Sequence, residues 1–84
     1  MKDYYFSFRS VTAAQRGLQA LTDAGIPALM GRTPGPLAKK GCGYCLRLSR
    51  LRAPEAARML RGMGTQGVWR RIGAVFEEAE HDLF

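Results

Sequence analysis

The segment from Gly31 to Gly43 constrains the fold most, because six of its 13 residues are glycine or proline. Such a density of turn formers predicts a loop rather than a helix or a strand. Periodic apolar patterns lie on both sides of it, so the loop separates two structured halves. A chain of 84 residues has room for one core, and we expect a single domain over residues 1–84.

Before the loop, the patterns predict a strand, a helix and a second strand. Residues 4–8 alternate large aromatic side chains with other residues, which is typical of a half-buried strand. Ser10 and Thr12 are both candidate N-caps for the helix, and Gly25 occupies the position after its end that favours glycine. Residues 26–30 then predict a second strand, with a proline near its start.

After the loop, a strand, a helix and another strand are expected. In residues 45–51, Leu46 and Leu48 would share one face, while Cys45, Arg47 and Ser49 would share the other. A helix should begin near residue 54, where proline suits a first turn, and end near residue 62. Residues 68–76 predict a fourth strand with a glycine as a weak point, and residues 77–84 predict an exposed acidic tail.

The resulting order, β-α-β-β-α-β, is the ferredoxin-like pattern of the α+β class. We therefore predict a four-stranded antiparallel sheet with two helices on one face.

The only two cysteines form the segment Cys42-Gly43-Tyr44-Cys45. Between residues 24 and 54 there are six basic residues and no acidic residue, and positive charge favours the reactive thiolate. Cys42, in the loop, is the better nucleophile, and Cys45, at the strand, is the better resolving thiol. The segment opens a strand and not a helix, so a thioredoxin-type active site is not expected. The candidate binding residues are Arg32, Lys39, Lys40, Gly41, Gly43 and Arg47.

Two other interpretations of the cysteines are open. A structural zinc site usually needs four ligands, and this pair supplies two; the single histidine, His81, lies in the acidic tail. We therefore expect no metal and no cofactor. Both thiols could instead be small apolar side chains at a strand edge.

The charge is uneven, because residues 1–76 hold all 13 basic residues but only three of the seven acidic ones. A basic body favours an anionic ligand, an acidic protein partner or nucleic acid, although a solvated surface explains the charge equally well. The sequence disfavours nucleic acid, because the third strand lacks stacking rings and Tyr5 would be the only outward aromatic residue. No apolar run approaches the roughly 20 residues that span a bilayer. We expect a cytoplasmic protein whose small core is compatible with a homo-oligomer.

Over nearly its whole length, the chain resembles the selenium/sulfur carrier protein-like family of small bacterial domains. The resemblance rests on the aromatic opening strand, Ala24-Gly25-Ile26-Pro27, Thr33-Pro34, Leu46-Arg47-Leu48 and, above all, the step Cys42-Gly43 ahead of a short apolar strand. Cys45 stands where many members carry a small residue, and Gly35-Pro36 replaces a more typical basic or polar pair.

This resemblance implies a carrier rather than an enzyme. Cys42 would hold sulfur or selenium as a persulfide-type adduct and Cys45 would release it, between a desulfurase-like donor protein and an acceptor protein. The alternative is a basic ferredoxin-like module that binds RNA or an acidic protein.

Overall fold

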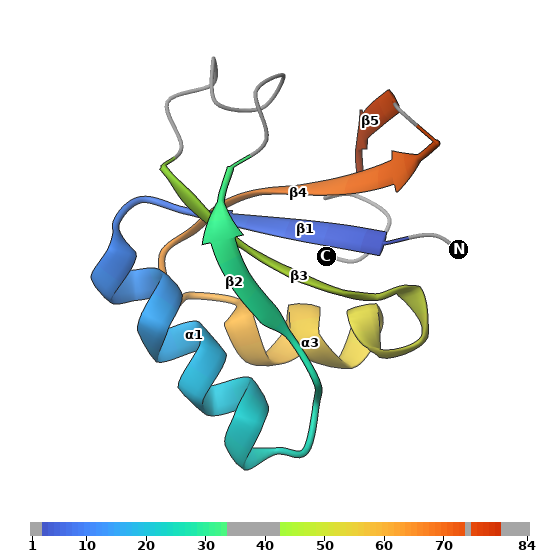
Figure 1. Cartoon of the computed structure of the whole chain (residues 1–84). Helices are drawn as coiled ribbons and strands as arrows, with labels where there is room; N and C mark the ends of the chain where they lie inside the picture. The colour runs from blue at the N-terminus through green and yellow to red at the C-terminus, as the bar shows by residue number, and fades with distance from the viewer. Residues whose placement is uncertain (1–2, 34–42, 74, 80–84) are drawn as a thin grey trace.

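The computed structural model describes residues 3–33, 43–73 and 75–79 (Figure 1). In chain order the elements are β1 (Asp3–Phe8), α1 (Val11–Asp23), β2 (Leu29–Arg32), β3 (Tyr44–Ser49), the 3₁₀ turn η1 (Arg50–Arg52), α3 (Ala53–Leu60), β4 (Thr65–Ile72) and β5 (Val75–Glu78).

The strands form one antiparallel sheet in the order β2-β3-β1-β4-β5. Both helices lie on the same side of this sheet (Figure 1). The predicted α+β class is therefore confirmed. The predicted four-stranded βαββαβ arrangement is wrong, because the described residues form a five-stranded sheet and the element order gains a second strand at its end.

The fifth strand arises at Gly73, inside the region predicted as one strand. Gly73 has a φ of 63°, a conformation that favours glycine, and the chain turns back there so that Ile72 pairs with Val75. Of the predicted acidic tail, Glu77 and Glu78 form the exposed end of β5, and residues 80–84 lie outside the described residues.

The ends of α1 follow their sequence signals. Ser10 is the N-cap, and its side chain accepts a hydrogen bond from the Ala13 amide at 3.2 Å. Gly25, with a φ of 76°, follows the last turn of α1. The Ile26 amide donates a hydrogen bond to the Leu21 carbonyl at 2.8 Å. Ile26 is thereby buried in the core, and β2 begins at Leu29 and not at residue 26 as predicted.

The main core lies between the sheet and the two helices. Tyr4, Phe6 and Phe8 of β1 point into it, and Phe6 and Phe8 are fully buried. The helix α1 approaches the sheet closely at Gly17, where an added Cβ would lie 3.0 Å from both Phe8 and Leu60. The opposite face of the sheet carries a second, smaller cluster, and the candidate site lies there.

Candidate functional site

Cys45 lies on the face of the sheet that the helices leave uncovered. The β-sheet register places it opposite Ser7 on β1 and opposite Gly31 on β2. Directly paired residues share a face, so the predicted separation of Cys45 and Arg47 from the core leucines of β3 is confirmed. The side chain of Cys45 is 3% exposed, and its thiol donates a long hydrogen bond to the Arg32 carbonyl at 3.9 Å.

A shallow pocket of about 330 Å³ opens over Cys45. Its lining residues come from β1, β2 and β3 and are Tyr5, Leu29, Met30, Gly31, Arg32, Cys45 and Arg47. Gly31 leaves the space beside the sulfur open, since an added Cβ there would meet no atom within 4 Å. A buried thiol with an open approach on one side can exchange with a small sulfur species that enters the pocket.

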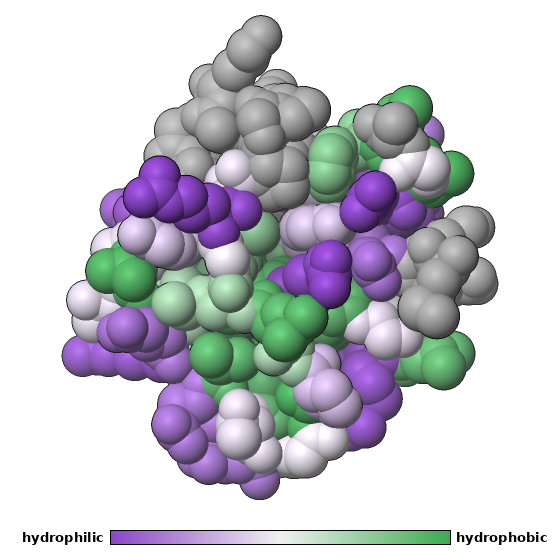
Figure 2. Space-filling view, in the orientation of Figure 1, coloured by the Kyte–Doolittle hydropathy of each residue, from purple (hydrophilic) through white to green (hydrophobic). Residues whose placement is uncertain are grey.

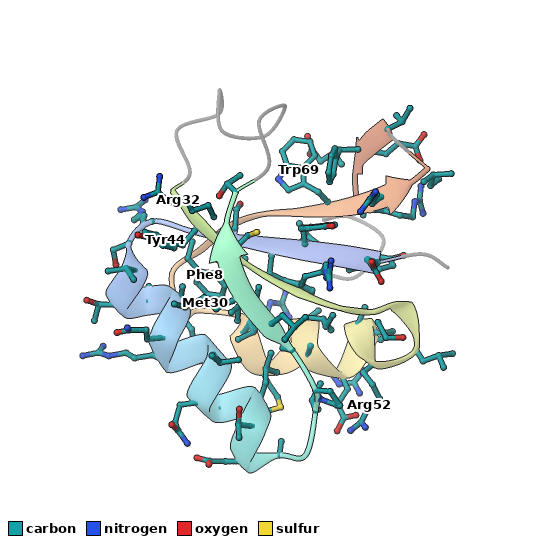
Figure 3. The ribbon with its side chains drawn as sticks, in the orientation of Figure 1. Phe8, Met30, Arg32, Tyr44, Arg52 and Trp69 are labelled. Carbon is teal, nitrogen blue, oxygen red and sulfur yellow. The ribbon has the colours of Figure 1, made fainter. Side chains whose placement is uncertain are left out.

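The positive charge of this pocket comes from the Arg47 guanidinium, because the side chain of Arg32 lies on the helix side of the sheet. Arg32 belongs to β2, although the sequence pattern predicted a loop there, and it pairs with Tyr44 on β3 (Figure 3). Arg47 lies opposite Tyr5 on the same face as Cys45. The Arg47 guanidinium is exposed, so its charge acts mainly on groups that enter the pocket from solvent.

Four of the eight predicted site residues can be placed in the structure. Cys45, Arg32 and Arg47 line the pocket together. Gly43 is exposed beside it, and its carbonyl accepts a hydrogen bond from the Thr33 amide at 3.2 Å. The other four predicted residues, Lys39, Lys40, Gly41 and Cys42, lie outside the described residues.

The prediction that Tyr5 would be the only outward aromatic residue is wrong. Trp69 and Phe76 lie on the same face and pack against Tyr5 and Cys45. The rings of Tyr5 and Phe76 meet edge to face at 5.2 Å and 75°, and the Arg71 guanidinium donates to the Tyr5 hydroxyl at 3.4 Å. Figure 3 shows Trp69 on the side of the sheet away from the helices. Alternation along β4 predicts which of its residues share a face with Trp69, but not which face of the sheet that is. The register of β4 with β1 determines that Trp69 lies on the face of Tyr5.

Arg70, the neighbour of Trp69 in β4, belongs to a different environment. It pairs with Tyr4 and therefore points to the helix side of the sheet. Hydrogen bonds with Glu77 and then with Tyr4 raise the pKa of Arg70. Its guanidinium donates to Glu77 at 3.0 Å and so links β4 to β5 rather than contributing to the thiol site.

Within residues 3–33, 43–73 and 75–79, no group of three His, Cys, Asp or Glu side chains is placed to hold a metal ion. Neither helix in the described part of the chain has the length and apolar character needed to cross a membrane.

Comparison with known proteins places the chain in a family. A family model described as "Putative Se/S carrier protein-like" matches residues 3–69, a span that includes both cysteines, the strands β1, β2 and β3, and the first part of β4. No curated protein matches the chain, and no solved structure matches it. The match covers most of the sequence, and the chain belongs to the Se/S carrier protein-like family.

Proposed function

We propose that this protein carries sulfur or selenium as a persulfide-type adduct on Cys42, with Cys45 as the resolving thiol. Family membership supports the cargo. The observation that carries the proposal is the position of Cys45, a buried thiol beneath a pocket that Gly31 leaves open and that Arg32 and Arg47 line.

Loading would be an ordinary thiol exchange. The Cys42 thiolate attacks the outer sulfur of a persulfide on a desulfurase-like donor protein, and a new S–S bond forms on Cys42. The old S–S bond breaks, and its electron pair leaves with the donor thiolate. With selenium, the same step transfers the terminal selenium atom.

Unloading would use the second thiol. The Cys45 thiolate attacks Cys42 Sγ, a disulfide forms between the two cysteines, and hydrosulfide or hydroselenide leaves toward the acceptor protein. The two electrons that depart with the cargo come from the cysteine pair. A cellular dithiol reductant must then reduce the disulfide before the next cycle.

The basic residues would favour both the thiolate and the anionic adduct. Positive charge near a thiol lowers its pKa and stabilises the attacking form. Arg47 lies on the same face as Cys45 and lines the pocket over it. Lys39 and Lys40, with the backbone at Gly41 and Gly43, are proposed to serve the adduct on Cys42. Exchange of this kind needs no further catalytic group and no cofactor, which is why we propose a carrier rather than an enzyme.

RNA binding, the alternative predicted from the sequence, is less well supported by the open face. Its central ring, Tyr5, is only 6% exposed. The register places Asp3 and Glu78 on the same face as Arg47 and Arg71, so the described charges there offset one another. A stacking platform needs exposed rings and a positive surface.

The test is intact mass after incubation with a donor protein that carries a persulfide, because a protein donor is too large to enter the pocket over Cys45. Wild-type protein and Cys45→Ser should gain about 32 Da with sulfur or about 80 Da with selenium, and Cys42→Ser should gain neither. The adduct should persist longer in Cys45→Ser, because the resolving thiol is absent. Arg58→Ser, a change on the exposed side of α3, is the control and should load like wild type. Equal loading of wild type and Cys42→Ser would overturn the proposal.

A further inference from the structure

The strand β2 is one edge of the sheet. Edge strands usually carry features that prevent pairing with another chain, but β2 presents apolar side chains. It pairs with β3 on one side and ends the strand order. Leu29, its first residue, is 62% exposed. Figure 2 shows hydrophobic side chains gathered over β2 and between β2 and the helices, with strongly hydrophilic groups on either side.

Beside this edge lies a groove of about 670 Å³. Its floor is mostly apolar, and its lining residues are Asp3, Thr22, Gly25, Ile26, Pro27, Ala28, Leu29, Arg47, Leu48 and Ser49. Leu29 and Arg47 also line the pocket over Cys45. The groove and the thiol pocket therefore adjoin each other along β2.

The two edges of the sheet differ in how they resist pairing with another chain. Natural edges are usually blunted by charged side chains, proline or a bulge. The β5 edge ends in Glu77 and Glu78. By contrast, β2 carries Leu29, Met30 and Gly31 ahead of its last residue, Arg32, so its length of four residues and this one arginine limit pairing. An apolar edge of this kind is the surface that strand addition uses.

The charges along this edge indicate the chemistry of the partner. Arg32, at the end of β2, lies on the helix side of the sheet, and Arg47 lies beside Leu29 on the open face; both arginines are exposed. Arg52 hydrogen-bonds the Gly25 carbonyl at the end of the groove but is already ion-paired with Glu55 at 3.1 Å. Among the described residues, Asp3 supplies the single carboxylate of the groove lining. Arg32 lies on the opposite face from Leu29, so its charge complements a segment that alternates apolar and acidic residues, because successive side chains of a strand point to opposite faces.

We propose that β2 binds an extended acidic segment of a partner protein, which adds to the sheet as a further strand. Its backbone pairs with the outer side of β2, one apolar side chain enters the groove beside Leu29, and its carboxylates meet Arg32 on the helix side. Binding here does not depend on the carrier function, although a bound segment would lie next to the Cys45 pocket.

The test uses a display library of random peptides of about ten residues, long enough to pair along a strand of this length. Enriched peptides should alternate apolar residues with Asp or Glu, and synthetic copies should be measured by fluorescence anisotropy. Leu29→Glu should weaken their binding by about tenfold or more, since it introduces a repulsive carboxylate. Val75→Glu is the matched control, because Val75 is 60% exposed on the opposite edge, and it should leave binding within about twofold of wild type.

Hydrogen exchange locates the site independently, because strand addition should slow amide exchange in β2 and not in β5.

Three results would overturn the proposal: no enrichment above background, enrichment of basic peptides, or binding that Leu29→Glu does not weaken. Light scattering tests whether a second copy of the chain occupies the β2 edge. A titration with a single-stranded RNA of about 12 nucleotides tests whether RNA binds there. A dimer that Leu29→Glu dissociates would assign the edge to a second copy, and RNA binding lost in Leu29→Glu would assign it to nucleic acid; either outcome refutes an acidic peptide.

Discussion

Gly31 lies directly opposite Cys45 across the β2–β3 pair, on the face of the sheet away from the helices. Paired side chains on one face have Cβ atoms about 5 Å apart, so any larger residue at position 31 would stand beside the sulfur. An added Cβ at Gly31 meets no atom within 4 Å, and the backbone there does not require glycine. The glycine is thus dispensable for packing but controls the approach to the thiol.

We predict that Gly31→Val slows alkylation of Cys45 about tenfold, because the branched side chain fills the approach to the thiol. The measurement is the rate of iodoacetamide labelling by mass spectrometry, with Cys42 changed to Ser so that one thiol remains. Gly31→Ala should give an intermediate rate. Thermal unfolding should show no loss of stability, since valine suits a strand better than glycine. If the rates are equal, the reagent reaches Cys45 by another route.

Gly17 allows α1 to pack closely on the sheet, and its replacement should destabilise the protein. The Cβ of Gly17→Ala would lie 3.0 Å from Phe8 and Leu60 and 3.2 Å from Leu46. We expect the free energy of unfolding to fall by about 1–3 kcal/mol, which outweighs the better helix propensity of alanine. Chemical denaturation measures this change, with Gln15→Ala on the exposed side of α1 as the control. A stabilised Gly17→Ala would mean that the helix can shift outward at little cost.

The hydroxyl of Thr33 is buried, and its removal should stabilise the protein, in contrast to the substitution at Gly17. Its side chain is 9% exposed, and no described group hydrogen-bonds its Oγ1. Thr33→Val keeps the shape and removes the unsatisfied oxygen, so the free energy of unfolding should rise by about 1 kcal/mol. Thr65 is the matched contrast, because its hydroxyl donates to the Leu60 carbonyl at 3.1 Å. Thr65→Val should destabilise the protein by a similar amount, and the reverse order of the two variants would contradict this account.

The local features of the fold were predictable from the sequence because short-range rules determine them. The helix start at Ser10, the glycine turn at Gly25 and the alternation of Leu46 with Cys45 all depend on neighbouring residues. The hairpin at Gly73 was missed, because a glycine within an apolar run signals either a weak strand position or a turn. The pairing of β5 with β4 shows that Gly73 lies in a turn.

The candidate site was only partly predictable from the sequence, because pairing between distant strands brings part of it together. The sequence identified Cys45 and Arg47, which are two positions apart on β3, and Arg32, which the pairing of β2 with β3 brings to the same pocket. It missed Trp69 and Phe76, which reach the same face only through the register of β1 with β4 and of β4 with β5. Contacts set by pairing between distant strands leave no short-range signal.

The contact of Phe76 with Tyr5 should hold β5 against the open face of the sheet. β5 pairs only with β4 among the described strands, and Phe76 packs edge to face on Tyr5 at 5.2 Å. Phe76→Ala removes this contact together with apolar area, so the free energy of unfolding should fall by about 1–2 kcal/mol. Val75→Ala is the matched control, because Val75 is the adjacent residue and is 60% exposed. Trp69, the sole tryptophan, reports the local change: its emission should shift to the red in Phe76→Ala and stay in place in Val75→Ala. Equal effects of the two variants would show that strand pairing alone holds β5 in place.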